Sequence, residues 1–255
     1  MKNKRLVIMA IVGVILIVIA TLQIVIYRKS NPWNAGRIGD IPCPVGYARL
    51  ATDDTYSDFL RDLPLKKRGS PVRLYTGGIA NYQFLSAGVI DLPVLCNSEQ
   101  CADVTMRMRA EYLWQTMQYD RICFKSVGGK SQVYSGGSSR AKFESFLKNV
   151  YEHSNTSSVY SETKVRNISD VRPGDVLVYP SRQKGRYGHA ILVADVAKSR
   201  SGRIAILCIE GNTPAREAHV VRNPNPFRTA WHSVNDSGDI QVSVFHFHSN
   251  ELRHY

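Results

Sequence analysis

The chain has few cysteines, and no two of them form a Cys-x-x-Cys pair. Five cysteines are spread over 255 residues. Zinc ribbons and thioredoxin-type redox sites depend on such pairs, so the sequence argues against both classes. An odd number leaves at least one thiol unpaired within the chain and permits up to two disulfides. The five are Cys43, Cys96, Cys101, Cys123 and Cys208.

Motifs for binding nucleotides or nucleic acids are also missing. Gly129-Lys130-Ser131 ends like a phosphate-binding loop, but Phe124 stands where that motif needs its first glycine. No nucleic-acid-binding motif is present, and an exported domain would rarely meet nucleic acid. We therefore expect no nucleic-acid partner and interpret the Gly/Ser-rich stretch 127–139 as a loop.

Acidic residues are scarce, and none occurs among the first 30 residues. The sequence has 33 Lys and Arg against 21 Asp and Glu, which gives a formal net charge of +12. Five basic residues lie in the first 30 positions, so the remainder carries about +7. A basic exported domain is attracted to anionic envelope polymers or lipid headgroups, although a basic surface also serves solubility alone.

An uncharged apolar run covers residues 6–27. About 20 such residues are enough to cross a bilayer. The apolar core of a cleaved signal peptide is shorter, about 7–15 residues, and precedes a small-residue cleavage site, whereas this run ends in Ile24-Val25-Ile26-Tyr27. We therefore predict one uncleaved transmembrane anchor over 6–27. The slight excess of positive charge before it predicts a cytoplasmic tail over 1–5.

Three further segments are predicted after the anchor. Residues 28–40 are polar and contain glycine and proline, which is typical of a linker. Residues 41–95 alternate short apolar runs with turns and are too few to fold alone, so we expect an N-terminal extension that packs on the core. Residues 96–250 carry helices first and strands afterwards, which indicates an α+β domain.

Helices and strands can be placed within that domain by periodicity. Asn97 and Gln100 fit a capping box for a helix from about Ser98 to Met117, and a second amphipathic helix covers 143–150. Strand candidates follow, separated by glycine-containing turns, at 175–179, 189–196, 203–209, 219–221 and 240–247.

Cys101 and His189 are the first candidate pair of functional residues. Cys101 lies in the first turn of the predicted helix, where the positive end of the helix dipole favours a thiolate. His189 opens an apolar strand and can take and return a proton. The pair suits acyl transfer by a cysteine nucleophile. Taken singly, a helical cysteine is usually a small core residue, and a strand histidine is usually structural.

Three other residues complete the predicted site. Glu210 and Asn212 follow the strand after His189, and adjacent antiparallel strands bring their ends together, so either side chain can orient the imidazole. The backbone amide of Cys101 and the side chain of Gln100 are candidate donors to an oxyanion. This chemistry needs no cofactor.

Four short motifs follow one another along residues 97–212. They are Gln100-Cys101, Pro173-Gly-Asp-Val-Leu-Val-Tyr179, Gly188-His189-Ala190 and Glu210-Gly-Asn212. In this order they resemble the CHAP and NlpC-type peptidases, relatives of papain that cut peptidoglycan peptides or glycan–peptide amides. The resemblance implies a papain-like α+β fold, in which the helix bearing the cysteine packs on an antiparallel sheet. Residues 125–165 would be an insertion in that fold.

Longer runs of sequence carry a second resemblance, over nearly the whole chain. They are Pro44-Val-Gly-Tyr-Ala-Arg49, Phe59-Leu-Arg-Asp-Leu-Pro-Leu-Lys66, Gln100-Cys-Ala-Asp-Val-Thr-Met-Arg-Met-Arg-Ala-Glu-Tyr-Leu113 and Gly188-His189-Ala190. These runs are similar to an uncharacterised bacterial family, domain of unknown function 4846. The similarity implies a bacterial origin and export, and it says nothing about chemistry.

His246 and His248 alternate along a predicted strand, with Phe245 and Phe247 on its other face. Alternating histidines can bind a metal, but no aspartate, cysteine or third histidine stands beside them in the sequence. We therefore predict no metal site. The other histidines are expected to be ordinary surface or strand residues, and charged residues on the Cys101 helix are expected to be solvated or salt-bridged, namely Arg107, Arg109 and Glu111.

The leading functional hypothesis is a membrane-anchored cysteine hydrolase or amidase, exported to the periplasm or the extracellular face of a bacterium. Cys101 would attack an amide carbonyl in cell-wall peptide, His189 would shuttle the proton, and Glu210 would orient His189. Two alternatives stay open. One is a non-catalytic module of the same fold that binds envelope glycan or a protein. The other is a structural envelope protein in which Cys101 forms a disulfide with Cys96.

Overall fold

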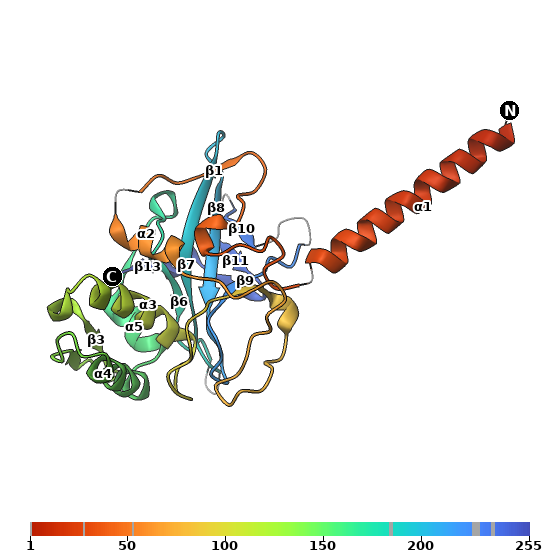
Figure 1. The fold of residues 1–255 in the computed structure, drawn as a ribbon. Helices are drawn as coiled ribbons and strands as arrows, with labels where there is room; N and C mark the ends of the chain where they lie inside the picture. Colours follow the sequence, from red (N-terminus) through yellow and green to blue (C-terminus); the bar gives the residue numbers. More distant parts are fainter. Residues whose placement is uncertain (1, 28, 53, 184–185, 226–229, 236–237) are drawn as a thin grey trace.

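A long apolar helix precedes the folded domain. The computed structural model describes residues 2–27, 29–52, 54–183, 186–225, 230–235 and 238–255. Helix α1 (Lys2–Tyr27) projects away from the rest of the chain (Figure 1). Within it, the stretch Lys4–Leu22 has a mean hydropathy of 2.8 and is not buried, so α1 is long and apolar enough to cross a membrane. Membrane anchors and signal sequences share this property.

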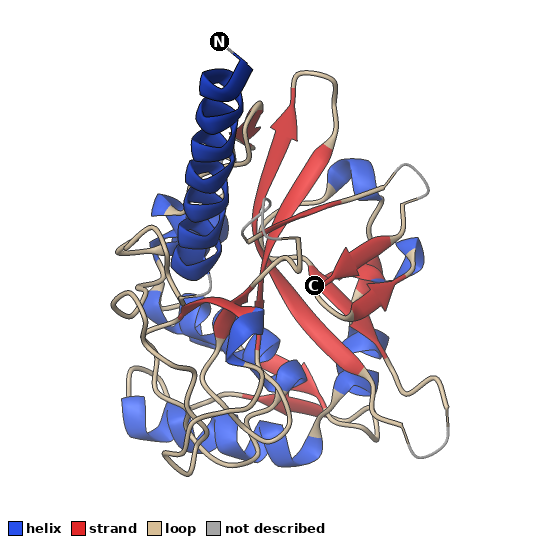
Figure 2. Ribbon diagram, turned by 90° about the vertical axis from the view of Figure 1, so that its right-hand side faces the viewer, coloured by secondary structure: helices blue, strands red, loops and turns tan. Residues whose placement is uncertain are grey.

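The domain is built on one antiparallel sheet, whose longest strands run through its middle (Figure 2). Among the described residues the sheet has nine strands, and together with the helices it confirms the predicted α+β class. Its main order is β2 (Ser86–Val89), β9 (His219–Val221), β8 (Ile204–Glu210), β7 (His189–Ser199), β6 (Val176–Tyr179), β13 (Leu252–His254) and β5 (Lys164–Val165), with β1 (Tyr47–Arg49) paired to β7 and β10 (Trp231–Ser233) paired to β8.

Four α-helices accompany the sheet: α2 (Thr55–Asp62), α3 (Cys101–Gln115), α4 (Arg140–His153) and α5 (Thr156–Glu162). Helix α3 packs on β7 and is buried over nearly its whole length, because α2 and α5 contact it as well. Met117, the predicted last residue of this helix, lies beyond the end of α3 and is exposed. Short 3-10 turns occur at Ile38–Asp40, Gln83–Leu85, Tyr119–Arg121, Ile168–Asp170 and Ser249–Glu251.

Alternate residues of the central strands enter two different cores. In β7, Leu192 packs on the side of the helices, whereas Ile191 and Val193 pack on the opposite side. The hairpin of β11 (Ile240–Val242) and β12 (Phe245–Phe247) covers that opposite side. A second hairpin joins β3 (Cys123–Lys125) to β4 (Ser131–Val133). Because β7 is buried on both faces, its residues 190–194 form a continuous apolar run, and each fully buried large aliphatic side chain there contributes about 1.5–3 kcal/mol.

The folded domain begins before residue 41 and continues past residue 250. The segment predicted to be a linker is packed against the domain, since Asn31, Ala35 and Ile38 are buried. The Asn31 amide donates hydrogen bonds to the carbonyls of Ala35 and Lys66. At the other end, β13 lies between β6 and β5 and therefore belongs to the sheet. Residues 41–95 supply β1 and β2 to the same sheet.

The strand predicted over residues 240–247 is a hairpin. Ser243 takes a φ of 53°, in the left-handed region that non-glycine residues seldom adopt. The chain reverses there, so β11 and β12 pair antiparallel, with Ile240 opposite Phe247. No glycine, proline or asparagine marks this turn in the sequence, which is why it was not predicted.

Candidate functional site

The candidate site lies at one end of the main sheet. Strand β7 begins there at His189, β8 ends at Glu210, and β9 begins at His219. The antiparallel register sets Glu210 directly opposite His219, with β7 on the other side of β8. Helix α3, which packs on β7, has Cys101 as its first residue. The chain therefore brings Cys101, His189 and Glu210 together from three separate elements.

Helix α3 begins three residues later than predicted. Gln100 is its N-cap residue, and the Gln100 backbone N–H donates to Asp103 Oδ2 at 2.8 Å. The capping box expected between Asn97 and Gln100 is therefore replaced by one between Gln100 and Asp103. Cys101 is the first helical residue, so its N–H is one of those that lack an acceptor within the helix.

His189 is held between a carboxylate and a thiol. Its Nε2 lies 3.2 Å from Glu210 Oε2, and both side chains are buried. Because Nε2 faces Glu210, Nδ1 is the ring nitrogen left for Cys101. Burial alone lowers the pKa of His189, but side-chain hydrogen bonds with Cys101 and with Glu210 outweigh it and raise the pKa to about 9. The imidazole is therefore protonated at neutral pH.

Glu210 contacts a second imidazole that the sequence did not point to. His219 Nε2 lies 3.3 Å from Glu210 Oε1, and His219 Nδ1 lies 3.1 Å from the carbonyl oxygen of Glu217. Burial alone raises the pKa of Glu210, but hydrogen bonds from His189 and His219 outweigh it and lower the pKa to about 2. His219, which we expected to be an ordinary strand residue, is buried and belongs to the site.

Asn212 does not reach the imidazole. Its Oδ1 accepts a hydrogen bond from the backbone N–H of Thr213 at 2.8 Å, so the side chain stays on its own loop. In the part of the chain that the structure describes, no hydrogen bond joins Asn212 to His189. The reason is that β8 ends at Glu210, which already occupies the Nε2 side of the ring.

Gln100 precedes Cys101, and Thr213 holds its side-chain amide by a hydrogen bond. The Thr213 hydroxyl donates to Gln100 Oε1 at 2.9 Å. That bond uses the acceptor end of the amide and leaves the donor end, Nε2, without a protein acceptor among the described residues. Gln100 and Cys101 both line the cleft, so Gln100 Nε2 and the Cys101 backbone N–H remain the candidate donors to an oxyanion.

Two glycines permit the close approach of these elements. A Cβ at Gly188 would lie 2.4 Å from the carbonyl oxygen of Tyr179 and 2.4 Å from Thr156 Oγ1. A Cβ at Gly211 would lie 2.5 Å from Val104 of helix α3. Gly188 precedes His189 and Gly211 follows Glu210, so both side chains of the site depend on a neighbour that lacks a side chain.

A cleft of about 650 Å³ opens beside Cys101. Residues 97–98 and 100–103 form one wall, residues 154–157 before and within α5 form another, and the exposed residues Arg186 and Tyr187 complete the lining. The lining is mainly polar, with hydroxyl and amide groups from Ser98, Ser154, Asn155, Thr156, Ser157 and Thr213. Cys101 is half-buried, so its sulfur is reachable from this cleft while His189 and Glu210 are covered.

Three charged residues of α3, Arg107, Arg109 and Glu111, do not line the cleft, and Arg107 and Glu111 are buried. Arg107 Nη1 lies 2.7 Å from Glu99 Oε1, and Arg140 Nη1 lies 2.6 Å from Glu111 Oε2. Arg107 is buried and already holds its carboxylate partner, so the prediction that it is salt-bridged is right, and solvation plays no part. Arg109 lies over the ring of Tyr255, 4.7 Å from its centroid.

All five cysteines are free thiols in the structure. The disulfide considered between Cys96 and Cys101 is therefore not formed. Cys101 alone among them lines the cleft and neighbours an imidazole of the site.

Fold and site together define an α+β protein with an N-terminal apolar helix and a buried histidine between a thiol and a carboxylate. The family described as domain of unknown function (4846) matches residues 39–136 and 132–254 of this sequence, so the chain belongs to that family. The matched residues include every member of the site and leave out α1. Curated proteins and solved structures give no match to the chain.

Proposed function

We propose that this protein is a membrane-anchored cysteine hydrolase or amidase with a papain-like arrangement, acting on amide bonds of cell-wall peptide. One observation carries the proposal. A half-buried cysteine at a helix N-terminus faces a cleft and neighbours a histidine whose other nitrogen is held by a buried carboxylate, and these three residues are Cys101, His189 and Glu210. The likeness of residues 97–212 to CHAP and NlpC-type peptidases supports the same interpretation.

The first half of the reaction forms a thioester. A cationic imidazole and the helix N-terminus both stabilise negative charge on the Cys101 sulfur, which attacks the amide carbonyl carbon. The new oxyanion accepts hydrogen bonds from the Cys101 backbone N–H and from Gln100 Nε2. His189 then gives its proton to the leaving nitrogen, the C–N bond breaks, and an amine departs.

The second half restores the thiol. His189 has lost its proton to the amine and now takes one from a water molecule as that water attacks the thioester carbonyl. The C–S bond breaks, a carboxylic acid leaves, and the proton returns to the Cys101–His189 pair. Glu210 stays ionised throughout, because its pKa is about 2, and it keeps Nδ1 of His189 directed at the sulfur.

The setting of the cleft favours an envelope substrate. Its hydroxyl and amide lining suits the polar backbone of a peptide or glycan–peptide, and Arg186 adds positive charge at the rim. The apolar helix α1 would hold the exported domain at the membrane, and the basic remainder of the chain is attracted to anionic polymers. The segment 125–165, which the resembled peptidases lack, supplies residues 154–157 to the cleft wall and would select the substrate.

Selective alkylation tests the nucleophile. Iodoacetamide at neutral pH should label Cys101 in the native full-length chain faster than Cys123, which is also half-buried but has no histidine of the site beside it. His189→Ala should slow labelling of Cys101 and leave Cys123 unchanged. Peptide mass spectrometry gives the rate at each position. Equal rates at Cys101 and Cys123 would end the proposal.

Digestion of purified peptidoglycan tests the reaction. The detergent-solubilised chain should release new amino groups from cell-wall peptide, and Cys101→Ser should reduce the rate by about 1,000-fold or more. Cys123→Ser is the matched control and should keep the full rate. If wild-type chain sediments with peptidoglycan but releases no amine, the non-catalytic binding module is the correct function instead.

A further inference from the structure

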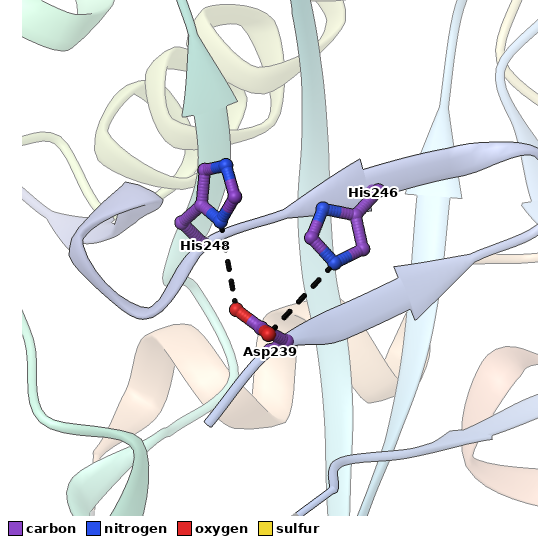
Figure 3. A group of neighbouring side chains, drawn as sticks. All are labelled: Asp239, His246 and His248. Carbon is purple, nitrogen blue, oxygen red and sulfur yellow. Dashed lines mark ion pairs between the residues drawn. The ribbon is translucent and has the colours of Figure 1, made fainter. Parts of the chain in front are cut away.

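The hairpin of β11 and β12 brings together three polar side chains that are distant in the sequence. Ile240 pairs with Phe247, so Asp239 immediately before β11 comes next to His248 immediately after β12. His246 is two residues from His248 and projects to the same side, because side chains alternate along a strand. Asp239, His246 and His248 therefore share one face of the hairpin (Figure 3).

Their donor atoms converge on one point. His246 Nε2 lies 4.0 Å from Asp239 Oδ2, and His248 Nδ1 lies 3.6 Å from Asp239 Oδ1. One nitrogen of each ring and one carboxylate oxygen lie within 4.8 Å of one another. The two rings meet edge to face, with centroids 5.0 Å apart and planes at 79°, so neither ring blocks the nitrogens of the other.

The two His–Asp contacts are longer than direct hydrogen bonds. Both His–Asp separations exceed the usual length of about 2.7–3.2 Å for such a bond. A tetrahedral ion with bonds of about 2.0–2.2 Å sets its donor atoms about 3.3–3.6 Å apart, so the donor atoms, now within 4.8 Å of one another, would draw closer on binding. The three side chains are 37–56% exposed, so an ion can reach them from solvent.

We propose that Asp239, His246 and His248 form a divalent transition-metal site, with Zn²⁺ as the preferred ion. Two imidazole nitrogens and one carboxylate oxygen suit Zn²⁺, whereas Mg²⁺ and Ca²⁺ prefer all-oxygen sites. Three protein ligands on an exposed face leave the fourth position to water or to an external donor. This site is separate from Cys101 and stands or falls independently of the proposed hydrolase activity.

The opposite face of the hairpin anchors the site to the domain. Phe247 is fully buried in the second core, and the Phe245 ring stacks on His189 with a centroid distance of 3.7 Å. Arg182 donates to the backbone carbonyl of His246 at 3.1 Å and lies over the ring of Tyr179. The backbone that carries the ligands is thus fixed, and a bound ion would in turn fasten the hairpin that covers His189.

Titration of the full-length chain with Zn²⁺ and Co²⁺ tests the site. Calorimetry should give one ion per chain, and His246→Gln and His248→Gln should each weaken binding by at least about tenfold. His153→Gln removes an exposed histidine elsewhere and should leave binding unchanged. Zn²⁺ should also raise the melting temperature of wild type and of His153→Gln, and should not raise that of His246→Gln. Similar melting of all variants in chelator verifies that they are folded.

Cys101→Ser separates this site from the thiol. Binding should persist in that variant, and Co²⁺ bound to wild type should give a ligand-field spectrum without the sulfur-to-metal band that a thiolate ligand produces. Loss of binding in Cys101→Ser with retention in His246→Gln would assign the ion to the thiol and overturn the proposal. Wild-type affinity in both His246→Gln and His248→Gln would overturn it as well.

Discussion

His219 Nε2 lies 3.3 Å from Glu210 Oε1, while the other oxygen of the same carboxylate faces His189. One buried anion is therefore shared by two imidazoles on the flanking strands β7 and β9. Because both donate to it, Glu210 stays ionised, and its negative charge in turn favours the protonated form of His189. His219 is thus a positioning residue, acting on His189 through Glu210.

Replacing His219 should destabilise the protein and disturb Glu210. His219→Ala removes one of two donors to a buried carboxylate, and we expect a loss of about 3 kcal/mol in the free energy of unfolding, near the low end for breaking a buried pair. His219→Gln keeps a donor and should recover part of it. Urea denaturation measures both, with His153→Ala as the surface control. An unfolding free energy of His219→Ala equal to wild type would contradict the shared-carboxylate interpretation.

The reactivity of the site should depend on the protonation of His189. The proposed acyl transfer needs a proton on His189, so the single-turnover rate should fall as the pH rises through about 9. Glu210→Gln removes one of the two hydrogen-bonding causes that raise this pKa. The midpoint should then move to lower pH by about 1–3 units. A pH–rate profile of thioester formation measures the shift, and an unchanged midpoint would show that Glu210 does not act on His189.

Stability should have a broad maximum set by the same two residues. The pKa of His189 is raised from 6.5 to about 9 in the folded state, so its contribution is complete below pH 6.5 and is lost as the pH rises through 9. The pKa of Glu210 is lowered from 4.5 to about 2, so its contribution is complete above pH 4.5 and is lost as the pH falls through 2. Denaturation midpoints measured between about pH 2 and 9 test both losses of stability. Glu210→Gln should reduce the loss of stability at acid pH.

Ionisation of Asp103 should lower the stability of the folded protein, whereas ionisation of Glu210 raises it. Burial raises the pKa of its carboxyl from 3.8 to about 8, so ionising it in the folded state costs stability as the pH rises from about 4 to 8. Asp103→Asn removes this cost and keeps an oxygen to accept from the Gln100 N–H. We therefore expect Asp103→Asn to be more stable than wild type at pH 9. A lower melting temperature of the variant at that pH would count against this account.

Gly188 and Gly211 should not tolerate alanine. At Gly188 the new Cβ would collide with the backbone oxygen of Tyr179, so β7 must shift and carry His189 with it. We expect Gly188→Ala and Gly211→Ala each to cost about 1–3 kcal/mol and to slow Cys101 alkylation. Gly128→Ala is the control, because a Cβ there meets nothing closer than 4.0 Å. If Cys101 of Gly188→Ala were alkylated at the wild-type rate, the close contact between Gly188 and Tyr179 would not be needed for the site.

The central strands β6 to β9 and three residues of the candidate site were predictable because each has a local signal. β7 and β8 are buried on both faces and appear as apolar runs, and Cys101, His189 and Glu210 each mark the end of an element. Asn212 was predicted for the same reason, its position after an apolar strand, but β8 ends at Glu210 and the chain has left the sheet by residue 212. Its side chain therefore bonds Thr213.

His219 and Asp239 escaped prediction because their partners are chosen by strand register. His219 meets Glu210 only because β9 pairs with β8 in the observed alignment. Asp239 meets His248 only because Ser243 turns the chain, and a serine there gives no turn signal. Sequence spacing shows which residues share one strand, whereas contacts between strands depend on pairing that the whole sheet determines.

The packing of Ser30 and Asn31 against the domain limits how far the domain can move from helix α1. With α1 in a bilayer, only two residues separate Tyr27 from Ser30, and the three Cα–Cα steps between them span at most about 10–11 Å. The domain therefore cannot swing outward on a tether. If α1 is retained as an anchor and the proposed substrate is a polymer, the domain would search only a thin layer along the lipid surface and would reach a polymer strand only where it passes close to that surface.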